Sequence, residues 1–224
     1  MTATEVAEAT ERPVPAKPLL RGWFHMGAIP LVLIAGIVLI TFGPTLAGRI
    51  SAAVYTLTAV QLFSTSAIYH RGNWAERLRA MLQRVDHANI FLIIAGTYTP
   101  LSVLLLPRPT ATLVLSIVWG GAFAGLLARL LWHRAPRWFW VPLYIALGWV
   151  AIWFIRPMGE AGGPAVISLV LAGGLAYTVG AVIYALKWPN PSPRYFGFHE
   201  IFHALTITAF VCHYVAVSLA IYRA

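Results

Sequence analysis

The sequence contains very few charged residues for its length. Only 10% of its 224 residues are Asp, Glu, Lys or Arg, whereas 59% are hydrophobic, and the mean hydropathy is +0.75. Soluble globular domains carry about 25% charged residues. This composition excludes an ordinary soluble domain and indicates an integral membrane protein.

Cysteine and alternating polar residues are also scarce. The single cysteine, Cys212, cannot form an internal disulfide, and we interpret it as a small packing residue in the last apolar run. The alternation of polar and apolar residues that is typical of a membrane barrel is absent. Since backbone groups in lipid must be paired within their own segment, long apolar runs predict helices.

Apolar runs of about the length of a membrane span recur along the chain. Because about 20 apolar residues cross a bilayer as a helix, we predict an all-α membrane protein with a seven-transmembrane-helix bundle. The first 21 residues have no apolar run, so we expect a flexible cytoplasmic tail over 1–21 and a single domain over 22–224. The predicted spans are 22–48, 50–70, 87–107, 109–128, 138–155, 161–186 and 201–222.

The basic residues fall mainly on one side of these spans. If the N-terminus is cytoplasmic, twelve of the sixteen Lys and Arg residues lie in inner segments and only Arg49, Arg108, Arg156 and Arg223 lie outside. Basic residues concentrate on the cytoplasmic side of membrane proteins. We therefore expect the N-terminus in the cytoplasm and the C-terminus outside. We read the net charge of +9 as a topology signal and expect no nucleic-acid partner.

The stretch HEIFH, His199 to His203, matches the H-E-x-x-H pattern of zinc metalloproteases. On a helix, histidines four residues apart share one face and can bind one Zn²⁺, and the intervening Glu200 can activate a water molecule. A soluble protease also needs a third ligand further along the chain. No acidic residue follows Glu200, and the later metzincin positions hold Thr206 and Ala209. The third ligand must therefore come from another helix.

Polar residues of three predicted spans meet at one depth. Ser66 and His70 lie one helical turn apart at the end of the second span, Asp86 stands at the start of the third, and HEIFH opens the seventh. With the N-terminus inside, all of them lie near the inner leaflet. Ionisable groups in a membrane span are costly unless they are paired or bind a ligand. This coincidence predicts a shared site.

Three imidazoles and an open fourth position are typical of a catalytic zinc site. His70, His199 and His203 would be the ligands. Asp86 could hold or deprotonate the water molecule, and the Ser66 hydroxyl could bond Asp86 or an oxyanion. The alternative is a polar cluster that fixes helix packing without a metal.

The other histidines are weaker candidates for ligands. His213 is ten residues beyond His203, about 15 Å along a helix, so we expect a hydrogen-bonded core histidine or a pocket residue. His25 and His133 stand at span ends, where interfacial roles are expected. His87 follows Asp86 but points elsewhere on the helix, and we consider it as a residue that supports the site without binding the metal.

Four motifs together resemble the haemolysin III family, the bacterial branch of the progestin and adipoQ receptor family. They are SAIYH, RVDHANIFLIIAGTYTP, FHEIFH and a later CHY. The resemblance implies a seven-helix bundle with zinc near the inner face. It implies His70, His199 and His203 as zinc ligands, Asp86 as the carboxylate at the zinc water, and Ser66 as the family serine. The receptor branch often has another polar residue in place of Glu200, which separates that position from the general-base role.

The resemblance also frames the function. The wider group includes alkaline ceramidases, so we expect a multi-pass protein of the bacterial inner membrane that hydrolyses lipid amides or esters and helps set lipid composition. Its partner would be a membrane lipid such as a ceramide-like lipid, and its cofactor would be Zn²⁺. One alternative is a lipid-sensing receptor or regulator with structural zinc. Another is a pore-forming haemolysin, although the chain lacks the water-soluble surface of a secreted toxin.

Overall fold

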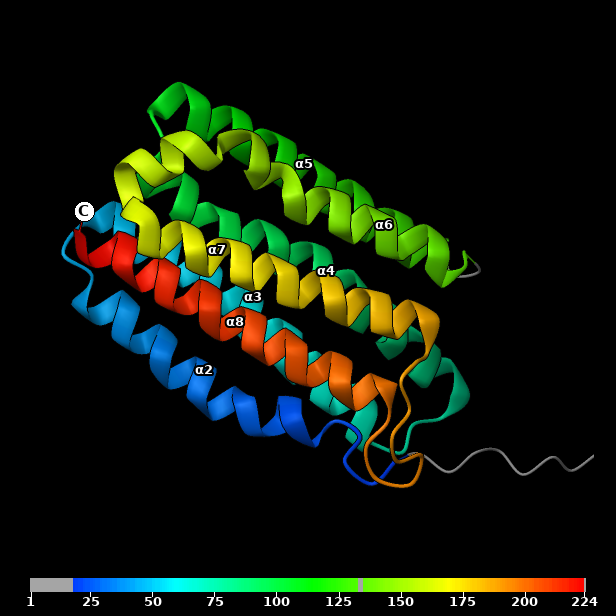
Figure 1. Cartoon of the computed structure of the whole chain (residues 1–224). Coiled ribbons are helices and arrows are strands. Elements are labelled where there is room, and N and C mark those ends of the chain that lie inside the picture. The colour runs from blue at the N-terminus through cyan, green and yellow to red at the C-terminus, as the bar shows by residue number, and fades with distance from the viewer. Residues whose placement is uncertain (1–17, 133–134, 224) are drawn as a thin grey trace, which may run out of the picture.

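The computed structural model describes residues 18–132 and 135–223, and its regular elements over these ranges are all helices. Figure 1 shows how these helices are arranged, coloured from blue near the N-terminus to red at the C-terminus. They are α2 (Trp23–Phe42), α3 (Leu46–Arg71), α4 (Glu76–Leu105), α5 (Arg108–Leu131), α6 (Arg137–Gly148), the 3-10 segment η1 (Trp149–Phe154), α7 (Ile155–Leu186) and α8 (Phe198–Arg223).

Six helical stretches of the described chain are long and apolar enough to cross a membrane. Five of them are single helices, and the sixth is the 50-residue stretch Arg137–Leu186, which contains α6, η1 and α7. Large apolar side chains cover the outside of the bundle, among them Leu31 on α2 and Leu175 on α7, both more than half exposed. Such an apolar exterior fits contact with lipid tails. The all-helical membrane architecture expected from the sequence is confirmed.

The stretch Arg137–Leu186 reverses direction at Gly163. This glycine has φ +79° and ψ 173°, a conformation outside the helical range and favourable only for glycine. Arg137 lies against Tyr184 at one end of the bundle, and Arg223 at the end of α8 donates to the Gly162 carbonyl at the other. The chain therefore runs along the bundle as α6 and the start of α7, and returns as the rest of α7 (Figure 1).

The centre of the bundle is formed by α3 and α4, which have the largest buried share among the candidate spans. In Figure 1, α7 and α8 lie side by side across these two helices, α2 covers one flank, and α5 and α6 lie on the other. The buried faces carry small residues as well as large ones. Close helix approach through small residues is a common source of packing energy inside membranes.

Gly96 of α4 is one such close approach. A Cβ atom built there would lie 2.0 Å from the Oγ1 atom of Thr58 on α3, and that hydroxyl group is held by a hydrogen bond to the Tyr55 carbonyl. The neighbour cannot move away without losing this bond. The two central helices therefore depend on the missing side chain for their spacing.

Substitution of Gly96 by Ala is expected to destabilise the bundle by about 1–3 kcal/mol, the usual cost of overpacking. The matched control is Gly120→Ala on α5, where a Cβ atom meets nothing within 4 Å. Unfolding of both variants in detergent, followed by circular dichroism against denaturant, measures the difference. Equal stability of the two variants would show that the α3 and α4 contact is not tightly packed.

The predicted tail over 1–21 lies mostly outside the described residues. Its last part is described, and it packs against the connection between α7 and α8. Leu19 and Leu20 donate backbone hydrogen bonds to the carbonyl groups of Arg194 and Tyr195. Arg21 forms an ion pair with Glu200 at the start of α8. The N-terminal segment thus covers the end of the bundle where α8 begins.

Candidate metal centre

The three predicted metal ligands lie together at one end of the bundle. His70 is the second-last residue of α3, which ends before Gly72, and His199 and His203 occupy the first two turns of α8. All three side chains are buried. Each offers one ring nitrogen, and these nitrogen atoms lie within 4.8 Å of one another.

The donor set and spacing fit a zinc ion. The Nε2 atoms of His70 and His199 are 3.1 Å apart. Two nitrogen atoms that bind one tetrahedral zinc ion at about 2.0–2.1 Å lie about 3.3 Å from each other. The rings of His199 and His203 lie edge to face, with centroids 4.6 Å apart, so their nitrogen atoms converge from one helix face. The geometry is that of a grouping able to hold a metal ion.

Asp86 and Ser66 complete this cluster. The Asp86 Oδ2 atom lies 3.8 Å from His70 Nε2, and Ser66 is within hydrogen-bonding reach of the Asp86 carboxyl group. Both side chains line the same cavity as His199 and His203. The structure therefore brings together five of the six residues singled out in the sequence, while their chemical roles remain predictions.

Glu200 is the sixth, and it faces away from the cavity. It is the third residue of α8, and its Oε2 atom accepts a hydrogen bond of 2.8 Å from the Gly197 N–H just before the helix. This back-bond is the glutamate half of a capping box. Its Oε1 atom pairs with Arg21. Both oxygen atoms are engaged in holding the helix start, which leaves Asp86 as the carboxylate that faces the three histidines.

Loss of Arg21 is expected to destabilise the protein because the Glu200 side chain is only 1% exposed. Removing one partner of a buried ion pair leaves an uncompensated charge, and we expect Arg21→Ala to cost about 3 kcal/mol. The control is Arg156→Ala, whose pair with Glu160 is largely exposed and is expected to contribute less than about 1 kcal/mol. Chemical unfolding in detergent measures both. Similar losses in the two variants would contradict a structural role for Arg21.

His25 is a residue of the site that the sequence reasoning missed. We expected an interfacial histidine at a span end, but the side chain is 3% exposed and lines the cavity. Its ring stacks on that of His203, with centroids 3.8 Å apart and an interplanar angle of 11°. The available signal was the helical spacing of His25 with Ala28 and Val32, which form one buried face of α2. His133 lies outside the described residues.

Arg129 corrects a second expectation. It is one of the twelve basic residues counted in the inner segments, directly after the predicted span 109–128, yet α5 continues to Leu131 and Arg129 is buried in the interior, where it is 9% exposed. Its Nη2 atom lies 2.8 Å from Nδ1 of His87, and its guanidinium group lies over Trp140. The Nε2 atom of His87 lies 3.0 Å from the hydroxyl group of Tyr184. Eleven of the remaining fifteen basic residues still fall on the predicted inner side.

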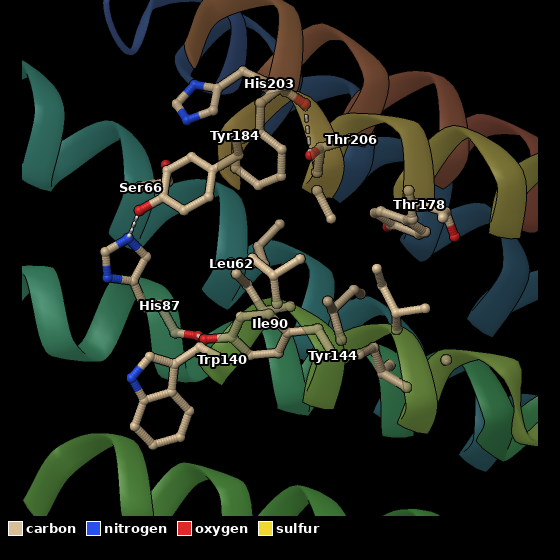
Figure 2. Close-up of a pocket in the computed structure, with 18 of the residues that line it drawn as sticks. Leu62, Ser66, His87, Ile90, Trp140, Tyr144, Thr178, Tyr184, His203 and Thr206 are labelled. Atoms are coloured by element: carbon tan, nitrogen blue, oxygen red, sulfur yellow. Dashed lines mark hydrogen bonds between the residues drawn. The ribbon is translucent and has the colours of Figure 1, made fainter. Parts of the chain in front are cut away.

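A cavity of about 140 Å³ opens beside the histidines and extends into the bundle. Figure 2 shows its lining, with His203, Ser66, Tyr184 and His87 at the polar end. Most of the remaining wall is apolar, and it includes Ile90, Ile93, Ile94, Tyr144, Ile145 and Trp149. The cavity thus joins a polar end to an apolar interior.

His213 also lines this cavity, away from the three-histidine group. Its Nε2 atom donates to the Val170 carbonyl at 3.2 Å, and it also lines a smaller cavity of about 40 Å³. It is not part of the three-histidine group among the described residues. The expectation of a hydrogen-bonded histidine separate from the metal ligands is confirmed.

Comparison with known families agrees with this architecture. Residues 15–214 match the family described as Haemolysin-III related, so the chain belongs to this family of membrane proteins. It is 31% identical over 140 residues to Hemolysin-3 of Bacillus cereus and 27% identical over 138 residues to the Hemolysin-3 homolog of Bacillus subtilis (strain 168). Each match covers 62% of this chain and 64% of the relative, so the chain spans less than two thirds of the length of these relatives.

A plant protein extends the comparison to the receptor branch. The chain is 28% identical over 186 residues to the Heptahelical transmembrane protein ADIPOR2 of Oryza sativa subsp. japonica, a match that covers 74% of this chain and 80% of the relative. The resemblance to the haemolysin III family and its progestin and adipoQ receptor relatives is therefore confirmed.

Proposed function

We propose that this protein is a zinc-dependent hydrolase of lipid amides or esters, with ceramide-like lipids as the substrate class. The observation that carries the proposal is the opening of a buried three-histidine group into a mostly apolar cavity. A mostly apolar cavity wall favours a substrate with a hydrocarbon chain over a water-soluble substrate. A lipid can place its acyl chain along Ile90 and Ile94 while its polar bond reaches His199 and His203.

His70, His199 and His203 would hold the metal. When bound, a zinc ion supplies a Lewis acid that polarises a carbonyl group and makes a water molecule acidic near neutral pH. Asp86 is the base in this proposal: it lies next to the histidines and can accept the proton of the attacking water. Ser66 orients the Asp86 carboxylate through its hydroxyl group.

The proposal includes a topology. In this topology the chain crosses the membrane seven times as a single domain, and the reversal at Gly163, which would divide Arg137–Leu186 into two crossings, supports that number. The excess of basic residues at the end that holds the histidines favours that end as cytoplasmic, with the C-terminus outside. The location would be the bacterial inner membrane, and the cellular role would be lipid homeostasis.

Turnover of defined lipids tests the function directly. Purified protein, loaded with zinc in detergent micelles, is incubated with a fluorescent N-dodecanoyl sphingosine and with a matched fluorescent ester, and the released fatty acid is measured. We expect release that stops when a chelator removes the zinc and returns when zinc is restored. Saturable lipid binding without any product would instead favour the receptor alternative.

A further inference from the structure

Arg129 determines the protonation pattern of His87. A guanidinium group has donors and no acceptor, so the Nδ1 atom of His87, 2.8 Å from Arg129 Nη2, must accept. An imidazole with an accepting Nδ1 carries its only N–H on Nε2. This N–H therefore points at the Tyr184 hydroxyl oxygen, 3.0 Å away, and donates to it. The direction of each hydrogen bond follows from the one fixed charge.

The hydrogen atom of the Tyr184 hydroxyl group is left to donate elsewhere. In the part of the chain that the structure describes, this hydroxyl group has His87 as its hydrogen-bond partner and no protein acceptor. Tyr184 lines the cavity, and Figure 2 shows its bond to His87 at the polar end. A donor without a protein acceptor in this position is available to a bound ligand.

Neighbouring groups hold Tyr184 next to the three histidines. Its ring lies edge to face with the ring of His199 at a centroid distance of 5.6 Å, and it also contacts Phe202. The guanidinium group of Arg137, on α6, lies over the Tyr184 ring at 4.5 Å from the ring centroid. The phenol is therefore fixed by its ring and by its oxygen atom, which is the condition for a preorganised donor.

We propose that Tyr184 is a catalytic residue whose hydroxyl group donates a hydrogen bond to the substrate carbonyl oxygen as negative charge develops on it. His87 and Arg129 are positioning residues that aim this donor. The inference rests on the proposed hydrolase, and it adds to the metal site a recognition element for a lipid oxyanion. It also gives a reason for a buried arginine in the cavity wall, since Arg129 sets the direction of the whole chain of donors.

The test combines a binding measurement with turnover. The probe is dodecanohydroxamic acid, a lipid whose anionic oxygen can sit at the metal, titrated calorimetrically into zinc-loaded protein. We expect Tyr184→Phe to keep its zinc, to bind the probe about 10- to 100-fold more weakly, and to lower kcat on N-dodecanoyl sphingosine about 100-fold with little change in KM. The control is Tyr222→Phe, the same change at a residue of α8 that is 49% exposed and is not among the residues lining the cavity; it should leave zinc, probe affinity and turnover unchanged.

His87 variants separate positioning from simple structural support. His87→Gln retains one acceptor and one donor and should keep most of the kcat, whereas His87→Leu should match the loss in Tyr184→Phe. Equal probe affinity and equal kcat in wild type and Tyr184→Phe would overturn the inference while the hydrolase stands. Weaker probe binding by Tyr184→Phe, with no turnover by wild type, would show that Tyr184 binds a lipid oxygen atom but would reject both its catalytic role and the hydrolase. A wild type that neither binds the probe nor turns over the lipid would overturn both.

Discussion

Replacement of any one of His70, His199 and His203 by alanine is expected to abolish metal binding. Wild-type protein should purify with close to one zinc ion per chain, and each variant with less than a tenth of that, because two imidazoles hold zinc far more weakly than three. The reason is geometric: the three ring nitrogens lie within 4.8 Å of one another and come from two helices that the fold brings together. Inductively coupled plasma mass spectrometry of the detergent-purified proteins measures the content.

The matched control for this series is His213→Gln. His213 is a buried histidine of α8, the helix that also carries His199 and His203, and it lines the cavity beside them. Its ring donates a hydrogen bond to the Val170 carbonyl, and it lies outside the three-histidine group. It should retain its zinc. Helix content from circular dichroism and gel-filtration behaviour identify any variant that has simply unfolded. Folded variants that keep the wild-type zinc content would show that these histidines are packing residues.

Asp86→Asn is expected to lower lipid hydrolysis by about 100- to 10,000-fold, the usual contribution of a general base. The amide has nearly the shape of the carboxylate and can still accept a hydrogen bond from Ser66, but it cannot take a proton from water. Because Asp86 is 3.8 Å from His70 and outside the three-histidine group, the zinc content should remain close to one per chain. Turnover of fluorescent N-dodecanoyl sphingosine, with zinc measured in the same samples, tests both statements.

The control for Asp86 is Glu76→Gln, an equal change of charge at the exposed start of the same helix. It should leave turnover unchanged. Normal turnover by Asp86→Asn would remove this carboxylate from the reaction, even if the protein proves to be a hydrolase. Loss of zinc along with turnover would mean that Asp86 holds the metal and is not only a base.

The position of the three-histidine group could be predicted because it depends on the depth of each span end and on the residue types found there. Charge placed the end of the second predicted span and the starts of the third and seventh on one side, and residue type singled out His70, Asp86 and the HEIFH stretch. The structure brings these residues together. The fold class followed in the same way from run length and composition.

The walls of the cavity could not be predicted because they depend on how each helix is rotated about its axis. A span that is apolar on every side gives no periodic signal for its inward face. Arg129 and Tyr184 stand near span ends, where a basic or aromatic residue usually contacts headgroups, and nothing in the sequence turned them inward. The predicted spans also do not give the helix ends: α4 begins at Glu76, ahead of the predicted span 87–107, because a helix can continue in charged sequence beyond the bilayer.

X-ray absorption at the zinc edge of the purified wild-type protein tests the three-histidine centre most directly. Three imidazole nitrogens at about 2.0–2.1 Å, together with one further light atom, are expected from a site built by His70, His199 and His203 with an open fourth position. A sulfur neighbour at about 2.3 Å, or a spectrum with fewer than three imidazoles, would contradict that centre.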